Sequence, residues 1–400
     1  MANDNLKHAK KAKNDEFYTQ WCDIEKEIMA YVEYNKDVFR GKTVLLPCDD
    51  PEWSNFTKFF AQNFEEFGLK KLISTSYAYE SKKVNMPYQT SLFEEQAPHF
   101  DPDINKIRGK IFTLDHDTNQ NGVIDIEDLE WQYLEGDGDF RSDEVKKLRN
   151  ESDIIITNPP FSLFREFLAW LFEEDKKFIM IGNKNCITYK ETFSKIKENK
   201  MWVGKTPMSV DLLFGVPNEE ELLSSKKLGS GYRIVDGKVL ARSQSIWLTN
   251  IEHGRRHQSL QLMTMADNIK HSKHKEIKGY EYQTYENYNA IEVPYTDAIP
   301  SNYDGVMGVP ISFLDKYCPE QFKIVDLGIV GSCKFTNNRK MEILDKNGNG
   351  TGKYTYNAKG TLYRKFNKDK DTSPAFKDVN DGTLYSSIYA RVLIQKRGNK

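Results

Sequence analysis

Cysteines and long apolar runs are scarce in this sequence. The five cysteines among 400 residues are an odd number, and no two of them are spaced as Cys-x-x-Cys. That usage argues against a disulfide framework or a cysteine-rich zinc site, and it favours a reducing cytoplasm. No stretch approaches the roughly 18 uncharged apolar residues of a membrane-spanning helix. The polar first residues lack the apolar segment of a secretory signal, so we expect neither membrane insertion nor export.

An excess of charge of one sign is missing from the whole chain but not from its parts. The net charge is −2 overall. Residues 331–400 hold 15 Lys and Arg against 6 Asp and Glu, a net charge of +9, so the other 330 residues carry −11. A basic C-terminal segment on an acidic body suggests a polyanion such as nucleic acid as partner, although a solvated lysine-rich surface would have the same composition.

Short apolar runs alternate with amphipathic, helix-like stretches up to about residue 250. This alternation predicts an α/β fold with a mainly parallel sheet and helices on both faces. In such sheets ligands bind beyond the carboxyl ends of the strands. We assign 1–16 to a basic N-terminal arm, 17–268 to the α/β domain and 269–400 to a smaller β-rich module. The apolar runs are TVLLP (43–47), KLIST (71–75), KIFTL (110–114), DIIIT (153–157), FIMIG (178–182) and SIWLT (245–249).

The segment DIIITNPPF (153–161) is the most informative, because it joins a buried strand to Asn158-Pro159-Pro160-Phe161. An exocyclic amine on a nucleobase is a poor nucleophile, since its lone pair is delocalised into the ring. Two hydrogen-bond acceptors, one for each amine hydrogen, would pull the nitrogen toward tetrahedral geometry and so free that lone pair. The Asn158 side-chain oxygen is one acceptor, and the Pro159 carbonyl, held where prolines fix φ and remove N–H donors, is the other. Phe161 offers a face for a base that is rotated out of the duplex. A rigid turn without chemistry would use the same residues.

This segment resembles the catalytic motif of amino-group DNA methyltransferases, which use S-adenosylmethionine. Asn at the first position is typical of the adenine-N6 type, whereas Ser is commoner in the cytosine-N4 type. The resemblance implies Asn158, Pro159, Pro160 and Phe161 as catalytic residues. Methylation of cytosine N4, RNA or a glutamine amide stays an alternative, because NPP-aromatic sites serve those reactions too.

The loop after the first strand lacks the glycine-rich turn that typical methyltransferases use for the cofactor. It reads PCDDPEWSNF (47–56), which closely resembles the EcoRI-type adenine-specific methyltransferases. The resemblance implies a Rossmann-like methyltransferase sheet, S-adenosylmethionine as cofactor and a C-terminal region that recognises double-stranded DNA. It also implies a bacterial or phage source, with a cognate restriction endonuclease as a candidate partner. Segments that resemble the family in its order are GDGDFRSDE (136–144), TNPPFSLFREFL (157–168), IGNKNCITYKE (181–191) and GVMGVPISFLDKY (305–317).

The missing glycines also motivate a different reading, a catalytically inactive DNA-binding protein that keeps the fold. Under the enzymatic reading, three segments hold the cofactor. The FYT-containing segment lies over it, the loop after the first strand binds its amino-acid end and ribose, and GDGDF serves its adenine unless it is a simple turn. The residues so assigned are Phe17, Tyr18, Thr19, Pro47, Cys48, Asp49, Asp50, Ser54, Asn55, Asp139 and Phe140.

An insertion at about 115–130 fits a twelve-residue EF-hand-like loop. Oxygen-bearing side chains fall at the first, third, fifth, ninth and twelfth positions, with glycine at the sixth. The last residue is Asp rather than Glu, which shortens its reach. We interpret the loop as either a structural Ca²⁺ site or an Asx/Gly-rich tip. The candidate ligands are Asp117, Asn119, Asn121, Asp125 and Asp128.

Basic residues in the last third of the chain are candidates for contacts with DNA. Lys and Arg bind phosphates, and Arg also reads guanine edges. The cluster HGRRH (253–257) fits phosphate contact or a solvated turn equally well. The candidates are Arg255, Arg256, Arg339, Lys340, Lys353, Arg364 and Lys365.

Overall fold

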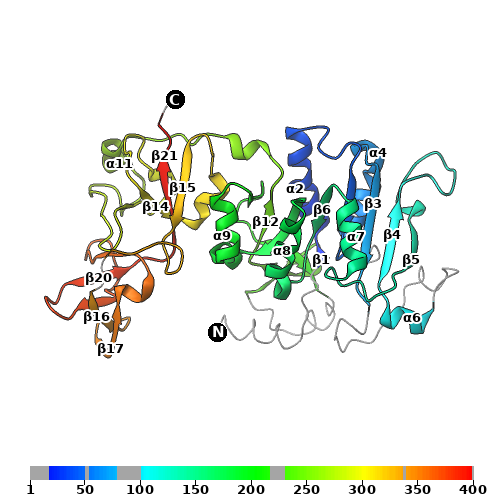
Figure 1. Ribbon diagram of the computed structural model, residues 1–400. Coiled ribbons are helices and arrows are strands. Elements are labelled where there is room, and N and C mark those ends of the chain that lie inside the picture. Colours follow the sequence, from blue (N-terminus) through cyan, green and yellow to red (C-terminus); the bar gives the residue numbers. More distant parts are fainter. Residues whose placement is uncertain (1–17, 50–53, 79–100, 217–229, 337–338, 399–400) are drawn as a thin grey trace. The chain divides into compact units, whose positions relative to one another are not determined.

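The structure is a computed structural model that describes residues 18–49, 54–78, 101–216, 230–336 and 339–398. The chain divides into two compact units (Figure 1). The first comprises Met1–Cys186 and Met201–Gly254, and the second comprises Ile187–Lys200 and Arg255–Lys400. The basic arm expected at 1–16 lies outside the described residues. Among the described helices, none is both long enough and apolar enough to cross a membrane.

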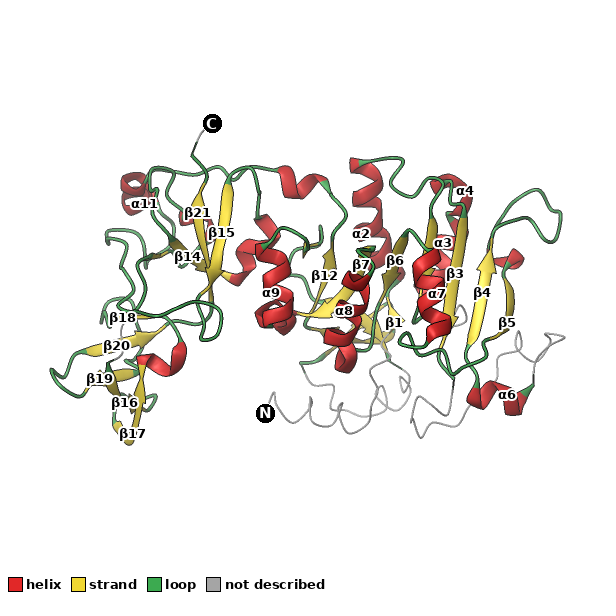
Figure 2. Ribbon diagram, in the orientation of Figure 1, coloured by secondary structure: helices red, strands yellow, loops and turns green. Residues whose placement is uncertain are grey.

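The first unit is built on an eight-stranded sheet with the order β5-β4-β3-β2-β6-β7-β12-β8 (Figure 2). The central strands β3, β2, β6 and β7 are parallel, while β4, β5 and β12 run antiparallel to their neighbours. The expected mainly parallel α/β sheet is therefore confirmed in its core. The strands are β2 (Thr43–Leu46), β3 (Lys71–Ser76), β4 (Lys110–Leu114), β5 (Glu130–Tyr133), β6 (Ile154–Thr157), β7 (Lys177–Asn183), β8 (Trp202–Val203) and β12 (Ser245–Thr249).

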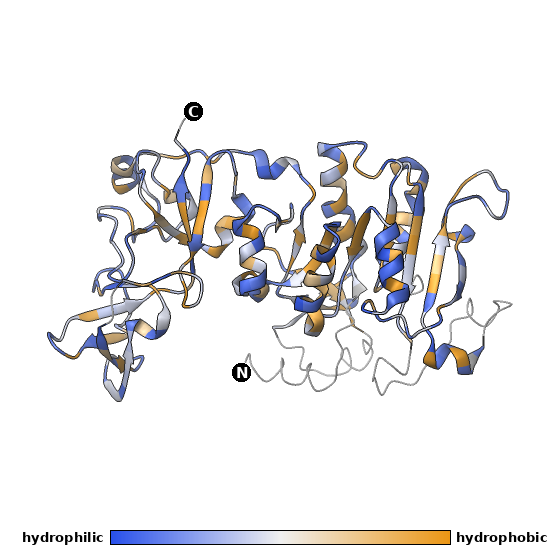
Figure 3. Cartoon of the chain, in the orientation of Figure 1, coloured by the Kyte–Doolittle hydropathy of each residue, from blue (hydrophilic) through white to orange (hydrophobic). Residues whose placement is uncertain are grey.

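Helices cover both faces of this sheet. Val44 and Leu46 on β2 pack in one apolar cluster with Tyr31 and Phe60 of α2 and α3. Leu45 points the other way, because side chains alternate along a strand, and α7 and α8 contact β2 and β7. Figure 3 shows apolar residues along the strands and mostly polar residues on α7. The helices are α2 (Trp21–Tyr34), α3 (Asn55–Gln62), α4 (Phe64–Phe67), α6 (Pro102–Ile107), α7 (Asp143–Glu151) and α8 (Phe164–Glu173).

A second, antiparallel sheet of the first unit has the order β1-β9-β11-β10. It brings the start of the described chain next to β9, because Thr19 pairs with Phe214. This pairing fixes where the FYT segment enters the fold. The strands are β1 (Tyr18–Thr19), β9 (Leu212–Gly215), β10 (Tyr232–Val235) and β11 (Lys238–Ser243).

The second unit is rich in β-structure, as the sequence predicted for its C-terminal part. It contains one sheet with the order β13-β14-β21-β15 and another with the order β17-β16-β19-β20-β18. The unit comprises residues 187–200 and 255–400, whereas the range expected from the sequence is 269–400. Its strands are β13 (Ile291–Glu292), β14 (Met307–Pro310), β15 (Phe322–Leu327), β16 (Lys340–Leu344), β17 (Gly350–Tyr356), β18 (Tyr363–Lys365), β19 (Phe376–Asp378), β20 (Leu384–Ser387) and β21 (Arg391–Lys396).

The remaining helices are short. Two are α-helices of the second unit, α9 and α11, and the others are 3₁₀ turns. Their bounds are α9 (Lys190–Lys197), α11 (Met265–His271), η2 (Ile126–Asp128), η3 (Phe161–Leu163), η4 (Lys184–Thr188), η5 (Gly254–His257), η6 (Thr296–Ala298), η7 (Ile311–Lys316) and η8 (Asn357–Gly360).

Candidate active site

The segment Asn158–Phe161, which the sequence predicts to be the catalytic segment, follows the carboxyl end of β6, an inner strand of the large sheet. Pro159 is buried, whereas Asn158, Pro160 and Phe161 are half-buried. The Pro160 carbonyl accepts a hydrogen bond from the Leu163 amide, which opens the turn η3. Within the described part of the chain, no backbone amide donates to the Pro159 carbonyl oxygen outside regular helices and strands. The segment thus presents a side-chain amide and a backbone carbonyl at the edge where α/β sheets bind ligands.

Phe161 lies partly against the core beneath this segment. Its side chain packs on the apolar cluster that contains Val44, Leu46 and Ile156. The ring is therefore held in place by the sheet while part of it stays exposed. A ring fixed in this way suits stacking, since little rotamer entropy is lost when a planar ligand binds.

A buried carboxylate connects the loop after β2 to the catalytic segment. Asp49 is 4% exposed. Its Oδ1 accepts a hydrogen bond of 2.7 Å from the Ser54 hydroxyl, and its Oδ2 accepts one of 2.6 Å from the Thr157 hydroxyl. Thr157 immediately precedes Asn158. Sequence reasoning missed Thr157, although a hydroxyl at a strand's carboxyl end directly before NPP was the available signal.

The backbone of Asp49 is tied to β3 as well. Its amide donates to the Thr75 carbonyl at 3.0 Å, and its carbonyl accepts from the hydroxyls of Thr57 and Ser74. Because its carboxylate already accepts two hydroxyl donors, Asp49 serves in this structure to hold three strand ends together. Pro47 is buried and Cys48 half-buried beside it, and Asp50 lies outside the described residues.

The FYT segment meets the start of α3. The Asn55 side-chain amide donates to the Thr19 carbonyl at 2.8 Å, and Ser54 caps α3 by accepting from the Phe56 amide. The Thr19 hydroxyl is buried and has no hydrogen-bond partner among the described residues. Of the other predicted residues, Phe17 and the side chain of Tyr18 lie outside the described part. The structure therefore brings Thr19, Ser54 and Asn55 together at the start of α3.

The GDGDF loop is fixed to the carboxyl end of β3. The Ala78 amide donates to the Asp137 carbonyl at 2.8 Å. Gly138 has φ +84°, and a Cβ at this position would overlap the Ser76 carbonyl oxygen. Only glycine allows this approach, so the loop depends on that residue.

Asp139 in this loop is hydrogen-bonded to Tyr77, a residue that sequence reasoning missed. The Tyr77 hydroxyl donates to Asp139 at 3.1 Å, and Arg141 binds the carboxylate through Nε and Nη2 at 2.9 and 2.6 Å. Burial raises the pKa of Asp139, but the bonds from Arg141 and Tyr77 outweigh it and leave that pKa below its ordinary value. Burial and the neighbouring Asp139 and Asp137 raise the pKa of Tyr77. Tyr77 follows β3 directly, at the carboxyl end of a strand, where α/β sheets bind ligands.

The sequence assigns Phe140, as part of GDGDF, to the cofactor adenine, but the structure places its ring in the core. The ring is 3% exposed and packs edge-on against Phe167 and Trp170, with centroids 5.1 and 5.8 Å apart. The ring is thus occupied by packing with aromatic residues of the core. Phe140 supports the loop from behind.

The EF-hand-like loop is closed by its own hydrogen bonds. Both oxygens of Asp128, which is 1% exposed, accept backbone amides, from Thr118 and Asn119 on one side and from Asp125 on the other. Asp117 accepts from the amides of residues 121 and 122. Residues 101–216 and the other described segments contain no group of three or more acidic, His or Cys side chains placed to hold a metal. The described residues thus give no support to Ca²⁺ binding by Asp117, Asn119, Asn121, Asp125 and Asp128.

Three of the arginines proposed for DNA contact are engaged within the second unit. Arg255 lies 3.4 Å from Asp315, and buried Arg256 bonds to the Asn199 side chain. Arg339 contacts Asp378 and Asp381 at 3.1 and 3.4 Å. These bonds limit what the guanidinium groups offer to a ligand.

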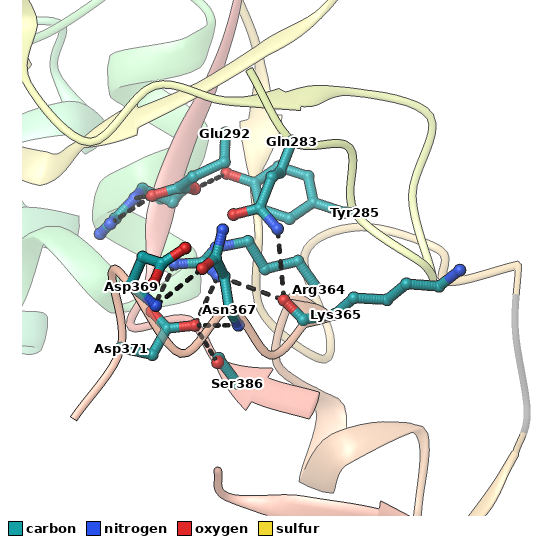
Figure 4. A network of polar contacts seen from close by, with 10 residues as sticks. Gln283, Tyr285, Glu292, Arg364, Lys365, Asn367, Asp369, Asp371 and Ser386 are labelled. Carbon is teal, nitrogen blue, oxygen red and sulfur yellow. Dashed lines mark hydrogen bonds and ion pairs between the residues drawn. The ribbon is translucent and has the colours of Figure 1, made fainter. Parts of the chain in front are cut away.

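The fourth arginine belongs to the polar network of Figure 4. Arg364 binds Asp371 through two bonds of 2.8 and 2.7 Å, and the Ser386 hydroxyl donates to the same carboxylate. The Lys365 side chain extends away from this network. Lys340, Lys353 and Lys365 are all exposed. The lysines are therefore better placed for phosphate contact than the arginines.

Comparison with known proteins places this site in a family. The family model for the adenine-specific methyltransferase EcoRI matches residues 5–397. The chain is 41% identical to the Type II methyltransferase M.EcoRI of Escherichia coli over 340 residues, covering 82% of this chain and 94% of that protein. It is 33% identical to M.MgeORF184P of Mycoplasma genitalium and 32% identical to M.MpnI of Mycoplasma pneumoniae, each over 80% of this chain and 84% of the relative. No solved structure gives a significant match. The chain therefore belongs to the EcoRI family of adenine-specific methyltransferases.

Proposed function

We propose that this methyltransferase transfers a methyl group from S-adenosylmethionine to the N6 amine of an adenine rotated out of duplex DNA. The observation that carries the proposal is the position of Asn158 and Pro159 at the carboxyl end of β6, fixed through the Thr157–Asp49 hydrogen bond. The family accounts for the adenine and for the type of cofactor. The residue roles below are part of the proposal.

Asn158 and Pro159 act on the target amine. The side-chain oxygen of Asn158 accepts one amine hydrogen, and the Pro159 carbonyl accepts the other. Both bonds strengthen as positive charge develops on the nitrogen, so they stabilise the transition state more than the ground state. Phe161, held against the core, stacks on the extruded base. No general base with an unusual pKa is required, because positioning supplies most of the effect.

The residues of the first unit fit the cofactor. S-adenosylmethionine supplies a methyl group on a positively charged sulfonium. The buried, unpartnered hydroxyl of Thr19 is available to a polar ligand group, and Ser54 and Asn55 lie where α3 begins. Asp139, with its lowered pKa, stays an acceptor at neutral pH for an exocyclic amine. The Tyr77 hydroxyl, beside Asp139 at the end of β3, binds a ribose hydroxyl of the cofactor.

The test is to identify the methylated nucleoside after incubating the protein with S-adenosylmethionine and duplex DNA. We expect N6-methyl-2′-deoxyadenosine, and Asn158→Ala should lower the rate by at least about 10²-fold, the usual cost of losing one such contact. Cofactor binding measured by calorimetry should remain. N4-methylcytosine, or methylation of RNA alone, would replace the proposal with that activity. Absence of cofactor binding in the wild type would favour an inactive DNA-binding protein.

The relatives named Type II methyltransferases suggest a role in restriction–modification. We propose that this chain protects one short DNA sequence against a cognate endonuclease. Methylation-sensitive sequencing of DNA from expressing cells would give that sequence. Methylation scattered over unrelated sequences would contradict the protective role.

A further inference from the structure

One face of the five-stranded sheet in the second unit is open along β16, β17 and β19. Lys340 pairs with Tyr356, and Glu342 pairs with both Tyr354 and Lys377. Residues that face each other across an antiparallel ladder point to the same side, so these side chains share one face. We call its four exposed members, Lys340, Tyr354, Tyr356 and Lys377, the lysine–tyrosine face.

The opposite face of the same strands is closed. Met341 on β16 and Phe376 on β19 pack with Tyr363 and Tyr385 in one apolar cluster. The lysine–tyrosine face therefore makes no contribution to the core of the sheet. Its residues are open to a partner without unfolding any strand.

The lysine–tyrosine face combines exposed rings with positive charge. Tyr354 and Tyr356 are 54% and 58% exposed, and the Lys340 ammonium lies 5.0 Å from the Tyr354 ring centroid. Two large neighbouring rings left this open on an edge strand are a feature of interaction surfaces. The cation–π contact also holds Lys340 in a defined direction before any partner binds.

The charge of this face selects an anionic partner. Among the described residues of β16, β17 and β19, Glu342 is the one acid on the same side, and its carboxylate accepts the Gly352 amide at 3.2 Å. Two lysine ammonium groups thus face solvent against one occupied carboxylate. Lysines bind phosphates as point charges, and a two-stranded ribbon such as β16–β17 fits a DNA major groove.

We propose that the lysine–tyrosine face binds the sugar–phosphate backbone of the duplex DNA substrate. Lys340 and Lys377 contact phosphates, and the rings of Tyr354 and Tyr356 pack against the strand. The inference rests on the proposed function, because it takes DNA as the substrate. It assigns this face to affinity and orientation rather than to the choice of bases.

The experiment measures binding of the full chain to a fluorescent duplex by anisotropy over a series of salt concentrations. Each phosphate contact contributes about 0.9 to the slope of log K against log salt. For K340A/K377A we expect the slope to fall by about 1.8 and binding to weaken by roughly tenfold. K340R/K377R should bind like the wild type, because the charge is kept.

The control removes the same charge elsewhere in the second unit. K316A/K323A replaces two exposed lysines of η7 and β15, and its slope should match the wild type. Equal losses in both double variants, or a wild-type slope in K340A/K377A, would overturn the proposal. Melting temperatures of all variants show whether any change reflects folding.

The tyrosines are tested separately. Y354A/Y356A should weaken binding several-fold, because the contact of both rings with the DNA backbone is lost, while Y354F/Y356F should keep the affinity. A change of oligomeric state in Y354A/Y356A with unaltered DNA binding would mean that a second copy occupies this face. Nucleoside analysis of the wild type in parallel keeps the two proposals apart. If the wild type methylates adenine and the variants bind DNA like the wild type, only the proposal for the lysine–tyrosine face is contradicted.

Discussion

At the scale of single residues, the Thr157–Asp49 hydrogen bond joins the loop after β2 to the end of β6, directly before Asn158. It joins residues 108 positions apart in the sequence. Asp49 also accepts a hydrogen bond from Ser54, the cap of α3, so one carboxylate connects the start of α3 with the residue that precedes Asn158. We therefore treat Asp49 as a positioning residue that acts through Thr157.

Thr157→Val should separate positioning from binding. Valine keeps the shape of threonine but leaves the buried Asp49 carboxylate with one donor fewer, at a cost of about 1–3 kcal/mol in unfolding free energy. We expect kcat to fall by roughly 10- to 100-fold, because a small misplacement of reacting groups has effects of that size, while the Kd for DNA is unchanged. Single-turnover kinetics with anisotropy would measure both. Thr157→Ser keeps the hydroxyl and should restore kcat. A serine variant as slow as the valine variant would rule out the positioning role.

The Arg364–Asp371 pair predicts how the second unit responds to acid. Burial raises the pKa of Asp371, but Arg364, the Asn367 amide and Ser386 outweigh it and hold that pKa below its ordinary value. The folded state thus binds this proton less readily than the unfolded chain, where the pKa is about 3.9. The stabilisation is complete above that value and is lost as the pH falls through the folded-state pKa.

Asp371→Asn should therefore lower the stability of the second unit at pH 7 by about 3 kcal/mol, because Arg364 is left buried beside a neutral group. The difference from the wild type should shrink as the pH approaches 3 in a denaturant titration. Asp369→Asn changes an exposed neighbour with the same charge and is the control. A constant difference at all pH values would show that the ion pair is not its source.

At the scale of elements, the GDGDF loop depends on one glycine. Gly138→Ala forces a positive φ on alanine and drives its Cβ into the Ser76 carbonyl oxygen. We expect a loss of at least about 1–2 kcal/mol in stability and weaker binding of S-adenosylmethionine, because the loop must withdraw from β3 and carry Asp139 with it. Calorimetry with the cofactor measures the second effect.

Gly136→Ala is the matched control in the same loop. Its added Cβ would meet Glu144 Oε2 at 3.7 Å, an ordinary contact, and its φ is not positive. Cofactor affinity should stay within twofold of the wild type. Similar losses in both variants would mean that the loop tolerates no side chain anywhere, and the specific role of Gly138 would fail.

Six of the eight strands of the large sheet were predictable because they contain apolar runs, as in TVLL and IIIT, whereas β5 (EWQY) and the two-residue β8 lack such a run. The same property placed NPPF after a strand. Phe140 was not predictable, since its packing partners Phe167 and Trp170 lie on a helix that follows later in the chain. Nor does any local pattern reveal that Asp49 meets Thr157. Spacing along a chain reports local periodicity, whereas these contacts depend on how β2 and β6 are placed side by side.

At the scale of the whole molecule, the basic character of the last 70 residues was visible in the sequence, but its use was not. Arginines looked as suitable for DNA as lysines. The structure pairs Arg339 and Arg364 with carboxylates and leaves Lys340 exposed. Composition counts charges without their partners, so it could not make that distinction.

Along the sequence, α9 lies between β7 and β8 of the first unit. It nevertheless belongs to the second unit, where it contacts β15. The polypeptide consequently passes from one unit to the other three times, near residues 186, 200 and 254. A single recombination event near residue 254 between two relatives would take α9 from one parent and β15, which it contacts, from the other. Hybrids that keep this contact therefore need to inherit α9 and residues 255–400 from the same parent.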